Sequence, residues 1–405
     1  MTSGEAARKA KKPSLVTPAF LLVLLSTLGY FLCVGMLLPV VPRFVSGPLG
    51  GSDVAVGLTA GVFSLTAVMM RPFAGRFGDR RGRRPLIVGG ATIVAATVLA
   101  YNVVDSIPVL VVFRLLAGLG EAAFFVGAAT AVNDLAPEER RGEAVSLFSL
   151  SLYAGISFGP ILGETALGTN NFELVWWMAA ICGFAAAAIA FRVRDARPEG
   201  AATAASGRLV HPAALLPGLV LASTVWAFSA FASFVSLYAL ELGMDGSRFV
   251  FFTYSFTILL IRFFGKSIPD ILGPRRAATI AATIVGAGMV IMAAWGEPIG
   301  LYIGAFVFGV GQAFGFPALM TLAVRGAPPW ERGAVVGTYT AFFDAAFGLG
   351  AISLGPVADT IGYQGTFAVS AGVAAAGLIL LRIRVREVPA SLAVPEPDAP
   401  PPGGV

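Results

Sequence analysis

The chain has 405 residues, of which 57% are hydrophobic and 13% are charged, and its formal net charge is +5. Soluble domains carry roughly 25% charged residues, so this composition excludes an ordinary soluble protein. Because a membrane-spanning helix needs about 20 apolar residues, the length accommodates about a dozen such helices and no sizeable catalytic domain outside the membrane.

Twelve apolar runs follow one another along the chain, and each is long enough to cross a bilayer as a helix. The predicted fold class is therefore an all-α membrane protein with twelve transmembrane helices. The runs cover residues 18–42, 54–75, 85–104, 107–132, 144–166, 172–191, 212–240, 248–268, 277–296, 298–324, 333–357 and 364–381.

Polar segments lie at both ends of the chain and near its middle. Residues 1–17 carry basic side chains and no cleavage site of small residues, which predicts a retained tail and not a signal peptide. Residues 192–211 are predicted to link two six-helix bundles, at 18–191 and 212–386. The proline-rich tail at 387–405 is predicted to be disordered.

Basic residues are distributed asymmetrically around the predicted helices. With the N-terminus inside, only Arg43 and Arg248 of the 28 lysines and arginines fall on the outer side, and Arg114 falls within a span. Because basic residues are retained on the cytoplasmic side, both termini are predicted to be cytoplasmic. This distribution explains the positive charge without nucleic-acid binding.

The two halves of the chain match at a constant offset of 191 positions. At this offset Arg71 recurs as Arg262, and Asp79 recurs as Asp270. Since six spans are an even number, both halves insert in the same orientation and are related by an axis along the membrane normal. Two pseudo-symmetric bundles of this kind are typical of alternating access, with a substrate site between the halves near the bilayer midplane.

Residue types that hold metals or catalyse reactions are scarce. Cys33 and Cys182 lie inside separate apolar runs, where we expect them to act as small core residues, and His211 is the only histidine. The sequence has no metal-ligand cluster, phosphate-binding loop or nucleophile with a partner base. We therefore expect no cofactor, no enzymatic activity, and no use of ATP.

The segment GRFGDRRGRR joins the second and third runs at residues 75–84. Its glycines allow a tight turn, and Asp79 is suited to pair with an arginine or to face a positive helix N-terminus across the interface between halves. A solvated basic loop is the alternative. The residues predicted to act in conformational gating here are Gly75, Asp79, Gly82 and Arg83, together with Arg71 and the repeat copy Asp270.

Four segments resemble motifs of the major facilitator superfamily. Residues 75–84 resemble its GxLaDRxGRR signature, residues 114–120 its RxxxGxG motif, and residues 39–42 the PxxP ending common in its drug exporters. Residues 155–163 match the GxxxGPxxG motif associated with its proton-driven antiporters. The resemblance covers essentially the whole chain and implies the major facilitator fold, a monomer in the plasma membrane, and transport like that of the 12-span drug:proton antiporters.

Gly155, Gly159 and Gly163 share one helical face at four-residue spacing, which allows another backbone to approach closely. Pro160 removes one intrahelical hydrogen bond and predicts a kink. Plain helix packing is the alternative to a gating role. The repeat carries Pro160 to Ala351, so only the first half keeps the motif, and we predict that these four residues act in gating.

Charged residues within the predicted spans are functional candidates, because burying a charge at lipid depth is expensive. Arg114 and Glu121 are seven residues apart, roughly 10.5 Å along one helix face, and we predict that they carry proton coupling. A static ion pair between helices is the alternative. Asp344 is the second candidate, for a proton, a cationic substrate or a bond across helices. For Glu164 and Asp359, near outer ends of spans, outer gating or plain solvation is expected.

Aromatic side chains gather in several runs, and the seventh presents Phe231, Phe234 and Tyr238 at helical spacing. Facing lipid is the alternative for any one of them. A cavity with an aromatic wall suits lipophilic or cationic compounds. The residues predicted to line the substrate cavity are Tyr30, Phe124, Tyr153, Trp226, Phe231, Phe234, Tyr238, Gln312, Tyr339 and Phe343.

Three functions are consistent with these features. The leading one is proton-coupled efflux of small lipophilic or cationic compounds. The second is a proton-coupled uptake symporter for a metabolite or organic anion, with Arg114 binding a carboxylate. We expect no second arginine at membrane depth, and the 155–163 motif is intact; both points argue against this function. The third is a non-transporting scaffold or sensor, which would not need buried charges. The expected partners are protons, a small molecule and the lipid bilayer.

Overall fold

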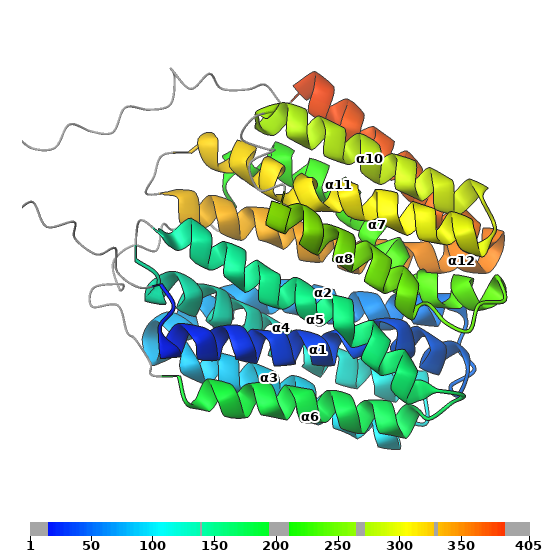
Figure 1. The fold of residues 1–405 in the computed structure, drawn as a ribbon, viewed down its shortest axis with the longest axis horizontal. Helices are drawn as coiled ribbons and strands as arrows, with labels where there is room; N and C mark the ends of the chain where they lie inside the picture. Colours follow the sequence, from blue (N-terminus) through cyan, green and yellow to red (C-terminus); the bar gives the residue numbers. More distant parts are fainter. Residues whose placement is uncertain (1–14, 138–139, 194–209, 265–271, 328–330, 385–405) are drawn as a thin grey trace, which may run out of the picture.

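The computed structural model describes residues 15–137, 140–193, 210–264, 272–327 and 331–384. Within these ranges the chain forms α-helices and one short 3₁₀ helix, with no β-strand (Figure 1). The elements are α1 (Pro18–Ser46), α2 (Asp53–Arg81), α3 (Arg84–Ala100), η1 (Tyr101–Val103), α4 (Ile107–Leu135), α5 (Arg141–Leu167), α6 (Phe172–Phe191), α7 (Pro212–Glu241), α8 (Arg248–Phe264), α10 (Pro274–Ala294), α11 (Pro298–Arg325) and α12 (Arg332–Arg384).

Local sequence explains where several helices begin. The side chains of Thr17 and Asn171 accept hydrogen bonds from backbone N–H groups in the first turns of α1 and α6, which satisfies donors that the helix itself leaves free. Proline occupies the first turn of α1, α3, α4, α7, α10 and α11, where its missing N–H costs nothing.

The last helix, α12, is broken at Gly362. Its 53 residues would extend roughly 80 Å as a single helix, far more than the roughly 30 Å of a bilayer core. At Gly362 the backbone has φ +75° and leaves the helical conformation, which glycine adopts without steric cost. The helix therefore consists of two segments, and in Figure 1 the second, coloured red, runs back beside the rest of the bundle.

Ten of the described helices are long and apolar enough to cross a membrane when α12 is counted once. The apolar runs predict the positions of these helices but not their ends. The second run stops at residue 75, whereas α2 continues to Arg81. Polar residues end a hydropathy signal without ending a helix, because the backbone hydrogen bonds continue through them.

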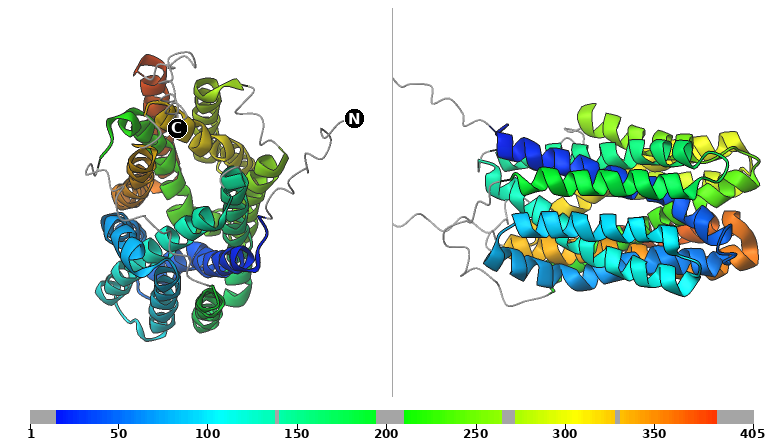
Figure 2. Two further views of the ribbon diagram at one scale, coloured as in Figure 1. Left: turned by 90° about the vertical axis from the view of Figure 1, so that its left-hand side faces the viewer. Right: turned by 90° about the horizontal axis from the view of Figure 1, so that it is seen from below.

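The helices are grouped into two halves, α1 to α6 and α7 to α12 (Figures 1 and 2). Within the first half α1 packs against α5 and α6, and within the second α7 packs against α12. Between the halves, α2 contacts α12, α5 contacts α8, and α1 contacts α7. The sequence repeat relates α2 to α8 and α5 to the first segment of α12, so the first two contacts are pseudo-symmetric copies of each other.

Basic residues mark one end of the bundle, which we call the arginine-rich end; the other is the arginine-poor end. The arginine-rich end lies at the left in Figure 1, where α1 and α7 begin. Among the described residues, Arg43 and Arg248 lie at the arginine-poor end. The described arginines at the arginine-rich end are Arg76, Arg80, Arg81, Arg83, Arg84, Arg140, Arg141, Arg192, Arg275, Arg276, Arg325, Arg332, Arg382 and Arg384.

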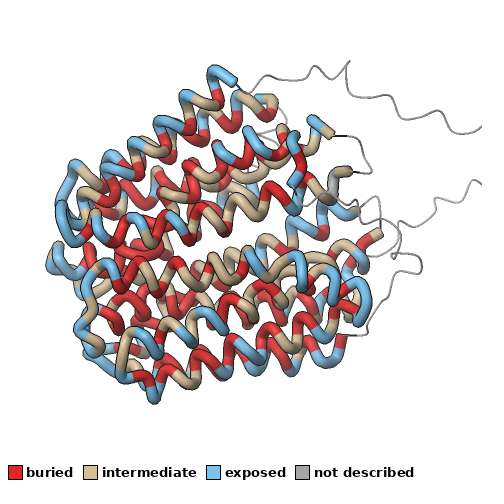
Figure 3. Tube along the Cα trace, turned by 180° about the vertical axis from the view of Figure 1, so that it is seen from behind, coloured by how far each residue is buried: buried red, intermediate tan, exposed pale blue. Residues whose placement is uncertain are grey.

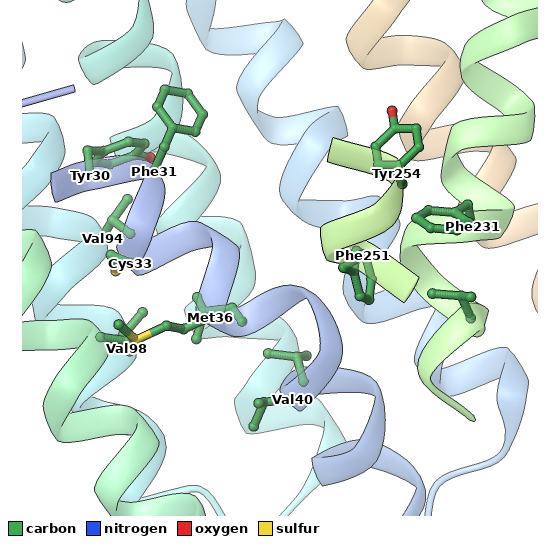
Figure 4. Close-up of a cluster of buried hydrophobic side chains, with 14 of the residues drawn as sticks. Tyr30, Phe31, Cys33, Met36, Val40, Val94, Val98, Phe231, Phe251 and Tyr254 are labelled. Carbon is green, nitrogen blue, oxygen red and sulfur yellow. The ribbon is translucent and has the colours of Figure 1, made fainter. Parts of the chain in front are cut away.

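Buried residues lie where helices face each other, and exposed residues lie on the outside of the bundle (Figure 3). Many of the exposed side chains are large and apolar, such as Leu25, Trp177 and Ile181. A surface of this kind is suited to lipid and not to water. Cys33 is buried against Val94 and Val98 in the first half (Figure 4), and neither cysteine forms a disulfide.

The backbones of α1 and α5 approach each other closely through glycine. A Cβ atom on Gly159 would lie 2.6 Å from Gly35 Cα, and one on Gly163 would lie 2.6 Å from the Met36 carbonyl oxygen. A Cβ atom on Gly155 would lie 2.5 Å from Phe31 Cβ. The close packing predicted for these three glycines is confirmed, whereas their role in gating stays a prediction.

We expect the Gly159→Leu variant to be less stable by about 1–3 kcal/mol, because a larger side chain has to push α5 away from α1. Thermal unfolding of the purified protein in detergent measures this. Gly372→Ala is the matched control, since a Cβ atom there meets nothing within 4 Å. Equal melting of the Gly159→Leu variant and the wild type would contradict the packing argument.

Candidate functional site

An ion pair joins the two halves inside the bundle. Arg71 on α2 lies ten residues before the end of that helix, and its Nε atom is 2.8 Å from the Asp344 carboxylate on α12. The two side chains are 16% and 7% exposed. The Arg71 guanidinium also lies over the Phe125 ring, 4.7 Å from its centroid. This contact is a charged link between halves with little access to water.

Glu121 on α4 lies close to this ion pair. Its carboxylate accepts a hydrogen bond from the Tyr30 hydroxyl on α1, and the Tyr30 ring stacks on Phe124 at a centroid distance of 3.8 Å. Glu121 interacts electrostatically with both Arg71 and Asp344. We call Arg71, Glu121 and Asp344 the ionic cluster, which has one positive group and two acidic groups.

The predicted pairing of Arg114 with Glu121 is not what the structure shows. The Arg114 Nε atom donates a hydrogen bond to the Thr59 carbonyl oxygen at 2.9 Å, and its guanidinium lies 4.6 Å from the Phe63 ring centroid. Although the two residues share one helix, Arg114 turns toward α2 and Glu121 turns toward α1. Partners on neighbouring helices therefore decide where each charge points.

A small cavity of about 70 Å³ lies between the halves. Its walls are mostly apolar, and Thr59, Arg114 and Ser233 are its polar residues. Cavities that enclose drug-sized ligands are several times larger, so this conformation holds only a small occupant. The lining residues are Val34, Leu37, Leu38, Val41, Pro42, Val56, Thr59, Ala60, Phe63, Val94, Arg114, Ala117, Ala232, Ser233 and Phe347.

None of the ten residues predicted to form the substrate cavity lines this one. Phe231 is fully buried and packs against Phe251, Tyr254 and Phe308 within the second half, and Figure 4 shows it turned toward Phe251 and Tyr254. Phe234 packs against the Tyr363 ring. Because α7 is buried on nearly every side, helical spacing alone did not reveal which face meets the cavity.

The other predicted cavity residues lie in helix contacts. Tyr238 packs against Tyr363 and Phe367, and the Tyr339 hydroxyl donates to the Phe316 carbonyl oxygen at 2.8 Å. Phe343 packs against Phe228 and Phe316. Trp226 is partly buried, and its Nε1 atom has no hydrogen-bond partner among the described residues.

Tyr153 and Gln312 lie near a second buried arginine. The Arg262 guanidinium on α8 stacks over the Tyr153 ring on α5, 4.5 Å from its centroid, and its Nη2 atom donates to the Tyr153 hydroxyl at 3.3 Å. Gln312 lies beside Tyr254, which interacts electrostatically with Arg262. Tyr153 and Gln312, which were predicted to line the substrate cavity, therefore lie beside Arg262. The sequence had indicated Arg262 only as the repeat copy of Arg71.

The glycine- and arginine-rich segment forms a polar cluster at the arginine-rich end. The Arg83 side chain donates to Asp79 at 2.7 Å and to Asp134 at 3.0 Å. Burial alone would lower the pKa of Arg83, but these two carboxylates raise it above the usual arginine value. The predicted pairing of Asp79 with an arginine is confirmed, with Arg83 as the partner.

Two glycines flank this cluster in different ways. Gly82 ends α2 with φ +95°, a conformation that favours glycine. Gly75 lies within α2, and a Cβ atom there would meet nothing within 4 Å. The repeat copy Asp270 lies outside the described residues.

The arginine-poor end is closed by a buried carboxylate. Glu164 on α5 accepts hydrogen bonds from the backbone N–H groups of Ser247 and Arg248 at 3.0 and 2.6 Å, and from the Ser247 hydroxyl at 2.8 Å. These N–H groups begin α8, where the helix dipole favours a negative charge. Glu164 is only 3% exposed, so the alternative of plain solvation is wrong for this residue.

A second carboxylate makes a similar contact between α12 and α2, one helical turn away from the position that matches Glu164 in the repeat. Asp359 on α12 accepts a hydrogen bond from the Asp53 backbone N–H, at the start of α2, at 2.9 Å. Beside it, a Cβ atom on Gly355 would lie 2.8 Å from Val54 Cα, and one on Gly57 would collide with the Ala351 carbonyl oxygen. The backbones of α2 and α12 therefore pack closely at this end.

The family follows from a comparison with known proteins. The family model of the Major Facilitator Superfamily matches residues 23–268 and 246–402. The chain belongs to the Major Facilitator Superfamily. It is a multi-pass membrane transporter, not an enzyme, and its membership implies small-molecule substrates.

Several relatives of this transporter span nearly the same length. An uncharacterized MFS-type transporter of Salmonella typhimurium is 27% identical over 371 residues, 88% of this chain and 94% of that protein. The staphylopine export protein of Staphylococcus aureus is 25% identical over 334 residues, 78% and 83% of the two chains. The human organic anion transporter MFSD10 (TETRAN) has a TM-score of 0.68 at 19% identity, covering 90% of this chain and 99% of that one, which shows the fold alone.

Sequence reasoning missed that Arg71 is the partner of Asp344, and it counted no arginine within the spans besides Arg114. That count is wrong, because α2 and α8 carry Arg71 and Arg262 into contact with the opposite half. The repeat contained the signal: the offset of 191 that links Arg71 to Arg262 also links Tyr153 to Asp344. Among the described residues, no group of His, Cys, Asp and Glu is arranged to hold a metal ion.

We expect Glu164→Ala to open the arginine-poor end, because the first N–H groups of α8 lose their charged acceptor. Hydrogen bonds to charged groups contribute about 1.5–3 kcal/mol each, so labelling of a buried cysteine near this end should accelerate at least about tenfold. A thiol reagent on a Val56→Cys variant lacking Cys33 and Cys182 measures this, since Val56 is buried and lines the cavity.

Asp105→Ala is the control for this experiment, because Asp105 is exposed at the same end and forms no ion pair among the described residues. Equal labelling rates in the Glu164→Ala and Asp105→Ala backgrounds would show that Glu164 does not hold this end closed.

Proposed function

We propose that this transporter is a proton-coupled exporter of small molecules that works by alternating access. In this proposal twelve helices cross the plasma membrane, with α12 crossing twice and α8 crossing once. The arginine-rich end and both termini are cytoplasmic, because basic residues are retained on that side. The two bundles rock against each other around a site between them.

The Arg71–Asp344 ion pair is the observation that carries the proposal. It connects the two halves, so any change in the charge of Asp344 changes the contact between them. The ionic cluster has a net charge of −1 when both carboxylates are ionised, and one proton makes it neutral. A buried site that alternates between these two charges is suited to couple a proton to a movement of the halves.

Glu121 provides the second proton position in this proposal. Its hydrogen bond with Tyr30 attaches the cluster to α1 in the first half. Because two carboxylates flank one arginine, either can take the proton while the other still compensates Arg71. The proton can therefore pass between Glu121 and Asp344 as the halves move.

The conformation described here fits the cytoplasm-facing state of such a cycle. The arginine-poor end is held by the contact of Glu164 with the start of α8 and that of Asp359 with the start of α2, in addition to close glycine packing. Proton binding from outside would require these contacts to open. We assign both carboxylates to outer gating on this basis.

Two observations support export. The GxxxGPxxG motif lies within α5, next to α1, and a relative that is 25% identical is an export protein. The apolar cavity walls favour a lipophilic molecule. The expectation of a cationic substrate has less support, because the aromatic residues that suggested it pack against other helices.

Uptake of an organic anion by proton symport is the second candidate. Two buried arginines besides Arg114, namely Arg71 and Arg262, contact the opposite half. Their presence removes one of the sequence arguments against this function. Both candidates use the same proton site. They differ in whether the proton and the substrate cross the membrane in opposite directions or in the same direction.

We expect Glu121→Gln and Asp344→Asn to abolish substrate-driven proton movement. Everted membrane vesicles with an imposed pH gradient, read by a pH-sensitive dye, measure this while lipophilic cations, neutral compounds and organic acids are added in turn. A compound that collapses the gradient in wild-type vesicles should do so at least about tenfold more slowly in either variant. Glu173→Gln is the control, since Glu173 is exposed at the start of α6.

A charge exchange separates coupling from a purely structural ion pair. The double variant Arg71→Asp, Asp344→Arg keeps opposite charges across the interface, so the fold should be retained. Full transport by this variant would show that the pair only holds the halves together. Loss of transport in a folded, abundant protein supports the coupling role.

A further inference from the structure

The sequence repeat duplicates the ionic cluster and changes its charge. The offset of 191 carries Arg71 to Arg262, Asp344 to Tyr153 and Glu121 to Gln312. Both copies lie where α2 or α8 meets the opposite half, because the contacts of α2 with α12 and of α5 with α8 are related by the same pseudo-symmetry. In the second copy, both carboxylates are replaced by neutral polar side chains.

The surroundings of Arg262 resemble those of Arg71. Each guanidinium lies over an aromatic ring, at 4.7 Å for Phe125 and 4.5 Å for Tyr153. Arg71 faces a carboxylate at 2.8 Å, whereas Arg262 faces a hydroxyl at 3.3 Å. Within the described part of the chain, the buried Arg262 Nε atom has no hydrogen-bond partner, and no carboxylate pairs with the guanidinium.

A guanidinium with a buried nitrogen and no counter-charge is costly, because that nitrogen loses hydration and gains no ion pair. Its side chain as a whole is half-buried. One negative charge would neutralise this copy, as one proton would neutralise the first. The second copy is therefore neutralised by binding an anion and not by binding a proton.

We infer that Arg262 binds a carboxylate group of the transported molecule, between α5 and α8. This inference rests on the proposed function, since it assigns part of the substrate to the site between the halves. Guanidinium matches the planar carboxylate with two parallel hydrogen bonds. A single negative charge is favoured over a phosphate dianion, because the site offers one positive charge to balance it.

The aromatic neighbours determine the rest of the substrate. Tyr153 and Tyr254 lie beside the guanidinium, and Gln312 lies beside Tyr254. A carboxylate on an aromatic or otherwise apolar body would place its charge on Arg262 and its body against these rings. Such a carboxylate also competes with the Tyr153 hydroxyl for Arg262, which loosens the contact between α5 and α8.

Arg114 is the competing position for the same charge, because it lines the cavity and also lacks a carboxylate partner among the described residues. Two features favour Arg262. Arg114 already donates a hydrogen bond to the Thr59 carbonyl oxygen. In addition, Arg114 is not the repeat counterpart of an arginine that forms an ion pair between the halves. The experiment below separates the two arginines.

Binding to the purified full chain in detergent tests the inference without any proton gradient, so its outcome is independent of the coupling experiment. The probes are benzoate, phenylacetate and indole-3-acetate, each compared with its primary amide. We expect at least one acid to raise the melting temperature and to bind about tenfold more tightly than its amide, since the amide lacks the charge. The preference should disappear in Arg262→Gln and persist in weakened form in Arg262→Lys.

Variants at Tyr153 provide a test that keeps the arginine. Tyr153→Asp restores the carboxylate found at the matching position 344, so it should neutralise Arg262 and abolish the preference for acids. Tyr153→Phe removes only the hydroxyl and should retain the preference. Arg248→Gln is the control for loss of a positive charge elsewhere on α8.

Three results would overturn the inference. One is that no acid binds the wild type better than its amide. Another is that the preference survives in Arg262→Gln. The third is that Arg114→Gln abolishes the preference while Arg262→Gln retains it, which would move the anion to the cavity wall.

Discussion

An ion pair between Arg71 and Asp344 joins the two halves of this transporter inside the bundle. A charge at this depth is tolerated only with a partner, so the pair constrains how α2 and α12 lie against each other. Glu121 and Tyr30 extend the same network to α4 and α1. Packing elsewhere in the bundle is mostly apolar or involves glycine, apart from the contacts of Glu164 and Arg262 between α5 and α8.

The fold was predictable from the sequence because long apolar runs and a gapless repeat leave few alternatives. The individual charges Glu121 and Asp344 were also recognisable, since each interrupts an apolar run. Their partners were not. Spacing along one helix suggested that Arg114 meets Glu121, yet each turns to a different neighbouring helix, and the rotation of a helix about its axis is set by tertiary packing. For the same reason Phe231 could not be placed from its periodicity.

Pseudo-symmetry explains both what is shared between the halves and what differs. The closure at the arginine-poor end is nearly symmetric, with Glu164 capping α8 and Asp359 capping α2. The polar sites deeper in the bundle are not symmetric in charge, because Asp344 and Glu121 correspond to Tyr153 and Gln312. A duplicated scaffold thus retains two equivalent positions and gives each a different electrostatic character.

The break at Gly362 leaves almost no connecting loop between the two segments of α12. The segment that carries Asp344 and Asp359 is therefore tied mechanically to the final helix, which begins one residue later. Because almost no loop separates the two segments, neither can shift far without the other, and α12 also contacts α10. The carboxylates at the interface and the final helix are thus parts of one nearly continuous helical element.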